Sequence, residues 1–448
     1  MLTKRKIPSI IKLDFSLDGK EVFVLNYIPR AIEPTIEKIS KEFPVLLVTG
    51  PRQVGKTTLL KVLSEKEKAT GIDRKYVTLD DPDIRYLAKT DPALFIQRYT
   101  PPVLIDEIQY APELFPYIKM SVDQSHRKGD FWLTGSQAFH LMKNVSESLA
   151  GRVGIVNLLG LSDSEIYRTP SHPFIADKTL LLETLPQKKP LGLNTIYERI
   201  FKGSMPALYT TDNPDLEIYY RSYIDTYLQR DISDLAQVAN KMQFYNFMTV
   251  VAAYTSKPVV YEDLASAVGI SAPTAKKWLS ILVSSHIIAL VQPYYNNALK
   301  RVVKMPQIHF LDTGLAAYLL KWGNPQALES GAMSGAFFES YVFSEIYKSY
   351  INAGQEPPLY YYRDKDKKEI DIIIYQNGTI FPIEVKKSAS PGKVSIKNFS
   401  VLNAVRDAIP FAGIESLKTN IGTGCVICMI NNLLPIDKDN WYVPVWLI

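Results

Sequence analysis

Residues 44–60 read Pro44-Val-Leu-Leu-Val-Thr-Gly-Pro-Arg-Gln-Val-Gly-Lys-Thr-Thr-Leu-Leu60, an apolar run, a glycine-bounded loop and the start of a helix. The apolar run Val45 to Val48 has the character of a buried parallel strand. Gly50 and Gly55 bracket a loop whose backbone N–H groups can converge on phosphate oxygens. The stretch therefore predicts a strand that leads into a phosphate-binding loop.

The loop matches the complete pattern G-x-x-x-x-G-K-T. Lys56 can reach the terminal phosphates of a nucleotide, and Thr57 offers a hydroxyl to Mg²⁺. A chance glycine turn is the alternative, but the flanking strand and helix supply the context that the motif requires. We therefore expect ATP and Mg²⁺ as cofactors. The residues predicted to bind the nucleotide are Gly50, Pro51, Arg52, Gln53, Val54, Gly55, Lys56, Thr57 and Thr58.

A second apolar run, Pro102-Val-Leu-Ile-Asp-Glu107, ends in two carboxylates. Phosphoryl transfer needs one acid near the metal and one group that orients the attacking water. We expect Asp106 to hold Mg²⁺ through its water shell and Glu107 to polarise the water. Solvated acids at a strand end are the alternative, which the preceding phosphate loop disfavours.

Four further residues are candidates for the nucleotide site. Thr134 and Ser136 end a strand and could sense the γ-phosphate or orient water, although a turn-forming Thr-Gly-Ser without a role fits equally well. Arg152 follows a helix and could act as an arginine finger in a neighbouring subunit, which would imply a homo-oligomer. It could equally be a partner of the helix C-terminal dipole. Arg30 could lie near the nucleotide or be solvated ahead of a helix.

Composition and length narrow the class of protein. A chain of 448 residues suggests about two to four domains. Its 46% hydrophobic and 22% charged residues are typical of a soluble globular protein, and its net charge of +5 is only mildly basic. No stretch approaches the ~18 apolar residues of a membrane span, and the N-terminus lacks a signal-peptide core. We therefore expect a cytoplasmic protein without a membrane partner. Cys425 and Cys428 are more typical of a buried strand than of a redox or metal site.

Three segments follow the phosphate-loop region. The proline-rich residues 169–191 indicate a linker, and a helical pattern at about 216–235 indicates a lid over the ATPase core. Residues 259–310 have two helices separated by Gly269 and then a β-rich return, which predicts a winged helix-turn-helix. Such a module binds DNA or packs against protein. The residues expected to touch DNA are Thr274, Lys276, Lys277, Lys300, Arg301 and Lys304.

Asn377-Gly378 is a strong hairpin signal between two β-rich runs, 369–375 and 379–386. With these two residues at the centre of the turn, Asp371 lies opposite Glu384. Carboxylates paired across strands repel unless a cation lies between them. The register also places a set of apolar residues together on the other face. They are Ile370, Ile372, Ile374, Phe381, Ile383 and Val385.

This pattern is typical of a divalent-metal nuclease centre. We expect Asp371 and Glu384 as metal ligands, with Glu339 as a further acid from an upstream helix. Lys386 would orient the nucleophilic water or stabilise charge on the phosphate. Pro382 cannot donate to a ladder, so we expect its strand to be edge-like or locally irregular. A solvated hairpin face with an Asp–Lys diagonal pair is the alternative. Nuclease folds also survive as binding modules without cleavage.

The chain resembles prokaryotic AAA ATPases in which a P-loop domain precedes a long C-terminal domain of unknown function. The matching stretches include Gly50–Thr57, Ile105–Pro112, Leu133–Gln137, Ser148–Arg152, Tyr227–Asp231, Phe310–Leu315 and Pro382–Lys386. The resemblance implies ATP binding and hydrolysis, a winged helix and a restriction-endonuclease-like C-terminal domain. The long proline-rich insertion, and Gly203-Ser204 in place of a Gly-Gly pair, depart from the family pattern.

The predicted fold is α/β, with an AAA-like P-loop NTPase parallel sheet, a helical lid, a winged helix-turn-helix and a C-terminal α/β PD-(D/E)xK nuclease-like domain. The expected domains are an N-terminal extension (1–28), the ATPase (29–165), linker and lid (166–240), winged helix (241–325) and nuclease-like domain (326–448).

Two functions remain open. One is a Mg²⁺-dependent ATPase whose nucleotide state controls a DNA-binding or DNA-cleaving module. The other is an ATP-dependent switch that binds DNA or a partner protein through an inactive nuclease fold.

Overall fold

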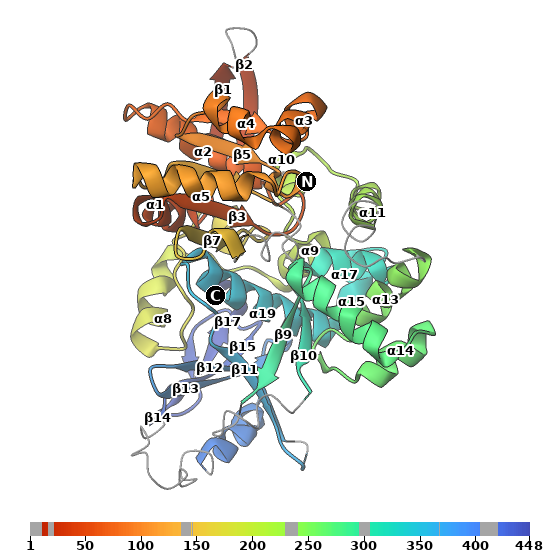
Figure 1. Cartoon of the computed structure of the whole chain (residues 1–448). Coiled ribbons are helices and arrows are strands. Elements are labelled where there is room, and N and C mark those ends of the chain that lie inside the picture. Colours follow the sequence, from red (N-terminus) through yellow and green to blue (C-terminus); the bar gives the residue numbers. More distant parts are fainter. Residues whose placement is uncertain are drawn as a thin grey trace, which may run out of the picture.

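The computed structural model describes residues 11–16, 22–135, 145, 147–228, 241–294, 305–366, 368–403 and 420–448. A five-stranded parallel sheet forms the N-terminal part, and a nine-stranded mixed sheet forms the C-terminal part (Figure 1). Helices α9 (Leu193–Lys202), α17 (Thr313–Leu319) and α19 (Ser334–Asn352) lie between them. A separate hairpin, β1 (Ile11–Ser16) with β2 (Val22–Tyr27), precedes the first sheet.

The N-terminal sheet is parallel throughout, with the order β4-β5-β6-β3-β7. Its strands are β3 (Val45–Thr49), β4 (Lys75–Thr78), β5 (Val103–Asp106), β6 (Phe131–Thr134) and β7 (Val153–Asn157). Every residue of the three central strands β3, β5 and β6 is buried, which explains why each is a continuous apolar run in the sequence. The parallel α/β sheet predicted for this region is confirmed.

Helices cover both faces of this sheet. They are α1 (Glu33–Glu42), α2 (Lys56–Lys68), α3 (Pro82–Thr90), α4 (Pro92–Arg98) and α5 (Leu114–Ser125). The phosphate loop joins β3 to α2. Gly50 has φ +137°, and a Cβ atom there would lie 2.1 Å from the carbonyl oxygen of Leu158. Only glycine fits this position, because the loop passes directly over the chain that leaves β7.

Residues 163–227 form short helices, including one in the predicted linker. They are α7 (Asp163–Tyr167), α8 (Lys178–Thr184), α9, α10 (Ala207–Thr210) and α11 (Leu216–Tyr227). Helix α9 packs mainly on α17 and α18 (Pro325–Ser330), and α11 packs on α17. Helix α11, the described part of the lid helix predicted at about 216–235, thus lies against the C-terminal part of the chain.

Three helices and an antiparallel strand pair follow. They are α13 (Lys241–Ala253), α14 (Tyr261–Val268) and α15 (Ala272–Ser284), with β9 (Ile288–Pro293) and β10 (Gln307–Phe310). Trp278 of α15 packs on α13, because its ring lies 5.2 Å from that of Phe244 and 5.5 Å from that of Phe247. Ser271 caps α15 by accepting a hydrogen bond from the Thr274 amide, as its sequence position predicted.

The C-terminal sheet continues directly from this strand pair. Strand β9 pairs in parallel with β11 (Leu359–Arg363), so the helices of residues 241–294 and the last part of the chain share one sheet. The other strands are β12 (Glu369–Gln376), β13 (Thr379–Lys386), β14 (Asn420–Ile421), β15 (Gly424–Cys428), β16 (Leu434–Pro435) and β17 (Asn440–Pro444). Both cysteines are free and buried on β15, as predicted.

The predicted hairpin register is confirmed between β12 and β13, where Gln376 pairs with Thr379 and Ile372 with Ile383. The register against β11 shifts, because Tyr360 pairs with Ile373 whereas Tyr362 pairs with Ile370. This bulge inserts one extra residue into β12 and reverses the side chains beyond it.

The predicted apolar face is therefore wrong for Ile370, which packs with Ile373 and Ile380. The expectation of one core face and one acidic face is also wrong. The short helix η4 (Lys393–Ser400) covers the second face of the hairpin, so that both faces are largely buried. None of the helices in the described part of the chain has the length and apolarity to cross a bilayer.

Candidate functional site

The carboxyl ends of the parallel strands bring the predicted nucleotide-site residues together. Asp106 is the last residue of β5 and is only 5% exposed. Thr57, at the start of α2, donates a hydrogen bond of 2.8 Å to Asp106 Oδ1. Thr134, at the end of β6, donates to the same oxygen. Asp106 thus joins the phosphate-loop helix α2 to β6, the strand that lies between β5 and β3 in the sheet.

Lys56 is folded back over the phosphate loop. Its Nζ atom donates hydrogen bonds to the carbonyl oxygens of Gly50 (3.0 Å) and Pro51 (2.7 Å). Lys56 is buried at the mouth of the loop, and its predicted contact with the terminal phosphates stays a prediction. An ammonium group has three donors, so a bound phosphate can take over one or more of these contacts.

Glu107 has a backbone conformation that is uncommon outside glycine, with φ +57°. Its N–H group donates to Thr134 Oγ1 at 3.1 Å, and its carboxylate accepts a hydrogen bond from Gln109. Thr134 therefore contacts both residues of the acidic pair. A strained backbone that fixes a carboxylate beside a phosphate loop is common at functional sites.

Three residues of this site were missed by sequence reasoning. The hydroxyl of Tyr76 donates to Asp106 Oδ2 at 3.2 Å, and burial, followed by the charge of Asp106, raises the pKa of Tyr76. The ammonium group of Lys61 lies 3.8 Å from the centre of the Tyr76 ring, and burial lowers the pKa of Lys61. The third is Gln109, which donates to the Glu107 carboxylate. None of the three belongs to a recognisable motif.

The donor set fits Mg²⁺. The Thr57 hydroxyl and the Asp106 carboxylate are oxygen ligands within 2.8 Å of each other, at the end of the loop that would hold the phosphates. Mg²⁺ prefers hard oxygen ligands and usually completes its shell with water and phosphate oxygens.

Arg30 supports the phosphate loop from behind. It is 5% exposed, so the solvated alternative is wrong. Its guanidinium group donates to the carbonyl oxygens of Val54 (2.9 Å) and Leu159 (2.7 Å) and pairs with Glu165 at 3.0 Å. It therefore fixes the loop against the chain that follows β7.

Two candidate catalytic residues are not brought to this site. Arg152 lies at the end of the strands opposite to the phosphate loop. Its carbonyl oxygen accepts a hydrogen bond there from the Val45 amide, at the start of β3. Its guanidinium group pairs with Asp123. It is too far away to serve the phosphate loop of its own chain, and a role in a neighbouring subunit stays a prediction. Ser136 lies outside the described residues.

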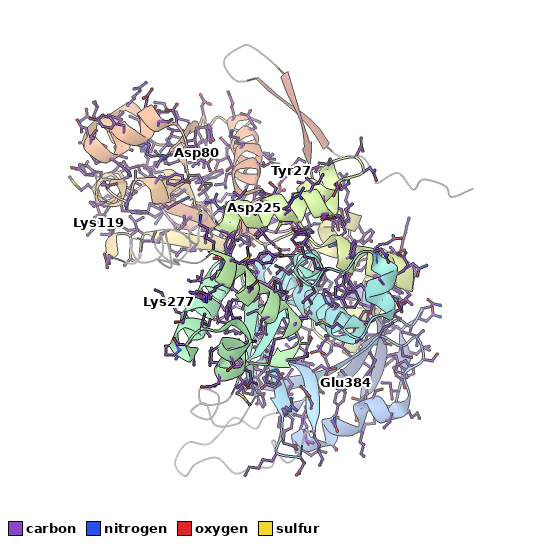
Figure 2. All side chains as sticks on the ribbon, turned by 90° about the vertical axis from the view of Figure 1, so that its right-hand side faces the viewer. Tyr27, Asp80, Lys119, Asp225, Lys277 and Glu384 are labelled. Atoms are coloured by element: carbon purple, nitrogen blue, oxygen red, sulfur yellow. The ribbon has the colours of Figure 1, made fainter. Side chains whose placement is uncertain are left out.

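The acids predicted for the C-terminal centre gather around Lys386. Its Nζ atom lies 2.6 Å from Glu384 Oε1 and 3.7 Å from Asp371 Oδ2. Asp371 also accepts a hydrogen bond of 2.8 Å from the Val385 amide. The second oxygen of Glu384 is buried and has no hydrogen-bond partner among the described residues. Figure 2 shows Glu384 within the C-terminal sheet.

The electrostatics of this cluster are those of crowded carboxylates. Burial, followed by the charge of Asp371, raises the pKa of Glu384 to about 7. Burial and the charges of Asp371 and Glu369 raise the pKa of Glu339, on α19, well above its usual range. Glu339 thus lies in the electrostatic field of the hairpin acids.

A divalent cation suits the chemistry of this cluster but not its present arrangement. Carboxylate oxygens, including the unpartnered oxygen of Glu384, are ligands that Mg²⁺ or Mn²⁺ accepts. No group of three or more His, Cys, Asp or Glu side chains in the described ranges is arranged to hold a metal ion. A cation between Asp371 and Glu384 would take the place that Lys386 Nζ occupies. The three-ligand set of Glu339, Asp371 and Glu384 stays a prediction.

The predicted DNA-contacting residues are only partly within the described chain. Lys276 and Lys277 are exposed on α15, and Figure 2 places Lys277 at the outer surface of the helices. Thr274 is half-buried beside the helix cap. Lys300, Arg301 and Lys304 lie outside the described residues.

The sequence matches three families in succession. Residues 42–167 match an AAA domain family. This part of the chain is AAA-like. Residues 193–326 match a domain of unknown function (DUF8612), and residues 334–448 match another (DUF4143). The AAA-like domain, with its complete phosphate loop, supports nucleotide binding, and the C-terminal part is DUF4143-like.

Two mycobacterial proteins are similar over most of the chain. They are the uncharacterized protein Mb2031c of Mycobacterium bovis (strain ATCC BAA-935 / AF2122/97) and the uncharacterized protein Rv2008c of Mycobacterium tuberculosis (strain ATCC 25618 / H37Rv). Each is 29% identical over 349 residues, which cover 78% of this chain and 71% of the relative.

Solved structures offer only distant likenesses. AMPPCP-bound DnaA from Aquifex aeolicus has a TM-score of 0.25 and 13% identity, and covers 56% of this chain and 84% of its own. A replication initiator DnaA bound to AMPPCP and single-stranded DNA has a TM-score of 0.26 and 13% identity, and covers 56% and 85%. Nothing about the ligands of this chain follows from likenesses of this size.

Proposed function

We propose that this chain is a Mg²⁺-dependent ATPase whose nucleotide state controls its C-terminal half. The observation that carries the proposal is the contact of Thr57, Asp106 and Thr134 at the mouth of a complete phosphate loop. Lys56 would bind the terminal phosphates, and Thr57 and Asp106 would hold Mg²⁺. Glu107 would orient the attacking water, with Thr134 fixing the positions of both acids.

A chain of buried polar contacts leads away from the phosphate loop. Arg30 bonds the loop at Val54 and pairs with Glu165. Glu165 also accepts hydrogen bonds from the Ala31 amide at 2.8 Å and from the Ser162 amide at 2.7 Å, which completes a capping box at the start of α7. The position of the loop and the position of α7 are thus linked by charged contacts.

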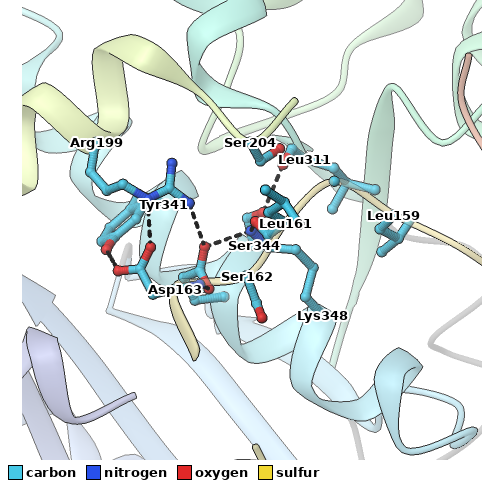
Figure 3. Close-up of polar contacts among 12 residues, drawn as sticks. Leu159, Leu161, Ser162, Asp163, Arg199, Ser204, Leu311, Tyr341, Ser344 and Lys348 are labelled. Carbon is cyan, nitrogen blue, oxygen red and sulfur yellow. Dashed lines mark hydrogen bonds and ion pairs between the residues drawn. The ribbon is translucent and has the colours of Figure 1, made fainter. Parts of the chain in front are cut away.

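Helix α7 is bonded in turn to α19, as Figure 3 shows. Asp163 pairs with Arg199 at 2.7 Å and accepts a hydrogen bond from the Tyr341 hydroxyl. The Asp163 amide donates to Glu345 at 2.8 Å, and Lys348 donates to the Leu161 carbonyl oxygen at 3.0 Å. All five side chains are buried, so these contacts are weakly screened by solvent.

Helix α19 contacts both the AAA-like domain and the C-terminal carboxylate cluster. Tyr341, Glu345 and Lys348 contact the AAA-like domain, and Glu339, on the same helix, lies in the field of Asp371 and Glu369. A rigid helix that contacts both regions can transmit a shift of the phosphate loop to the C-terminal carboxylate cluster. This continuity supports the control that we propose.

DNA is the partner that we propose for the C-terminal half. The supporting features are the three helices of residues 241–284 with their strand pair, which have the order of a winged helix, and exposed Lys276 and Lys277 on α15. The carboxylate cluster would then cut DNA with a divalent metal. The second candidate function is a switch that binds DNA or protein without cutting. It is favoured by Lys386, which already neutralises the hairpin acids.

The test is to incubate the purified chain with linear and supercoiled DNA and Mg²⁺ or Mn²⁺, with and without ATP. Lys56→Ala should abolish ATP turnover, whereas Lys68→Ala, at the exposed end of α2, should not. An unchanged ATPase rate in Lys56→Ala would overturn the proposed ATPase.

Asp371→Ala separates the two candidates for the C-terminal half. An ATP-controlled nuclease is supported if DNA cleavage is lost in Asp371→Ala and retained in the exposed-site control Asp366→Ala. Cleavage should also require ATP, and Lys56→Ala should abolish the response to ATP. ATP turnover without cleavage supports the switch.

A further inference from the structure

The turn that follows α15 lies against the phosphate loop. His286 and Ile287, in this turn, line a small space together with Pro51 and Val54 of the loop and Gly160 beyond β7. These residues lie far apart in the sequence. The C-terminal half therefore forms part of the wall beside the nucleotide site.

The turn presents His286 on a fixed backbone. The His286 amide donates to the Val283 carbonyl oxygen at 2.9 Å, and the Ile287 amide donates to that of Leu282 at 3.0 Å. His286 thus has φ +53°, a left-handed conformation in which glycine or asparagine is usual after a helix. The Leu311 amide also donates to the Ile287 carbonyl oxygen at 3.1 Å, which anchors the turn to the C-terminal part.

The imidazole of His286 lies in the electrostatic field of Lys56. Burial, and after it the charge of Lys56, lowers the pKa of His286 to about 4. The ring is therefore neutral at pH 7, with one N–H donor and one acceptor nitrogen. No hydrogen bond of this ring occurs within the described ranges of the chain. A free donor thus lines the same small space as Pro51, whose carbonyl oxygen accepts a hydrogen bond of 2.7 Å from Lys56 Nζ.

We propose that His286 is a nucleotide-binding residue contributed by the C-terminal half, whose imidazole N–H donates to a phosphate oxygen of the bound nucleoside di- or triphosphate. The inference rests on the proposed nucleotide binding at the phosphate loop. It gives the end of α15 a direct contact with the nucleotide. Binding would then fix the helix that carries Lys276 and Lys277, by a route separate from α19.

The test is the affinity of the full chain for ATP and ADP with Mg²⁺, measured by isothermal titration calorimetry. His286→Asn removes the imidazole and keeps a residue that tolerates the left-handed conformation. His286→Arg keeps a donor for phosphate oxygens. His126→Asn is the matched control, because His126 also follows a helix with φ +53° but lies between α5 and the start of β6, whereas the phosphate loop follows the end of β3.

We expect His286→Asn to weaken nucleotide binding about ten-fold, the usual loss for a hydrogen bond to a charged group. His286→Arg should stay within a few-fold of the wild type, and His126→Asn should bind like it. Unchanged affinity in His286→Asn, or an equal loss in His286→Asn and His286→Arg, overturns the inference and leaves the proposed ATPase intact. Absence of binding by the wild type overturns the proposed function itself.

Discussion

Arg30 and Val54 are joined by a hydrogen bond of 2.9 Å from the guanidinium group to the carbonyl oxygen in the phosphate loop. The same guanidinium group bonds Leu159 beyond β7 and pairs with Glu165, whose side chain is only 1% exposed. The phosphate loop is therefore held in place by a residue that precedes it by two secondary-structure elements, α1 and β3.

Replacing Arg30 with Met should destabilise the protein and weaken nucleotide binding. The change leaves Glu165 charged and unpaired in the interior, which typically costs about 3–5 kcal/mol of unfolding free energy. Denaturant unfolding measures this cost. Arg127→Met is the control, because Arg127 is 60% exposed in its pair with Asp130 and should cost about 1 kcal/mol or less. Equal costs in the two variants would contradict a structural role for Arg30.

Thr134→Val should slow ATP turnover about 10- to 100-fold while changing nucleotide affinity less. The hydroxyl of Thr134 donates to Asp106 and accepts the Glu107 amide at 3.1 Å, so its loss lets both acids move. Steady-state turnover and binding titrations separate the two effects.

The control for Thr134→Val is the same change at Thr49, the last residue of β3. Its hydroxyl is buried without a partner in the described structure. Thr49→Val should leave turnover unchanged and raise the free energy of unfolding by about 1 kcal/mol, because it removes an unsatisfied polar group. Equal turnover in the two variants would show that Thr134 does not position the acids.

His309 should make the protein sensitive to mild acid. It is fully buried and stacked on Phe343, and burial lowers its pKa from 6.5 to about 3. Between these values the unfolded chain binds a proton that the folded chain does not, so the free energy of unfolding falls as the pH falls below 6.5. The loss by pH 5 is about 2 kcal/mol.

Unfolding of His309→Leu between pH 6.5 and 5 should therefore show a shallower decline than the wild type. His172→Leu, at an exposed histidine, should keep the wild-type slope. A wild-type slope in His309→Leu would mean that other groups control the acid response.

Tyr341→Phe should weaken the connection between the two halves. The Tyr341 hydroxyl bonds the charged Asp163, so its loss should cost about 1.5–3 kcal/mol of unfolding free energy. Tyr350→Phe is the control on the same helix. Within the described part of the chain its hydroxyl donates to a neutral acceptor, the Phe174 carbonyl oxygen, so its loss should cost about 1 kcal/mol.

DNA binding with and without ATP tests the functional consequence of this connection. The ATP dependence should shrink in Tyr341→Phe and persist in Tyr350→Phe. An unchanged ATP dependence in Tyr341→Phe would mean that the contacts of α19 with Asp163 do not carry the coupling.

The sequence by itself determined the features that depend on short-range order. The phosphate loop, the strand ending in Asp106 and the hairpin pairing of Gln376 with Thr379 follow from residues within one or two adjacent elements. Buried parallel strands appear as apolar runs, and Asn377-Gly378 fixes the turn, so local chemistry was sufficient for each.

Only the tertiary structure decided the features that depend on distant partners. Arg30 became a support of the phosphate loop because Leu159 and Glu165 satisfy its other donors. Ile370 changed faces because β11 imposed a bulge, and η4 buried the side expected to be acidic. His286 reached the phosphate loop because α15 ends beside it. Burial and pairing across such separations leave no periodic pattern in the chain, since they are set by how the elements pack.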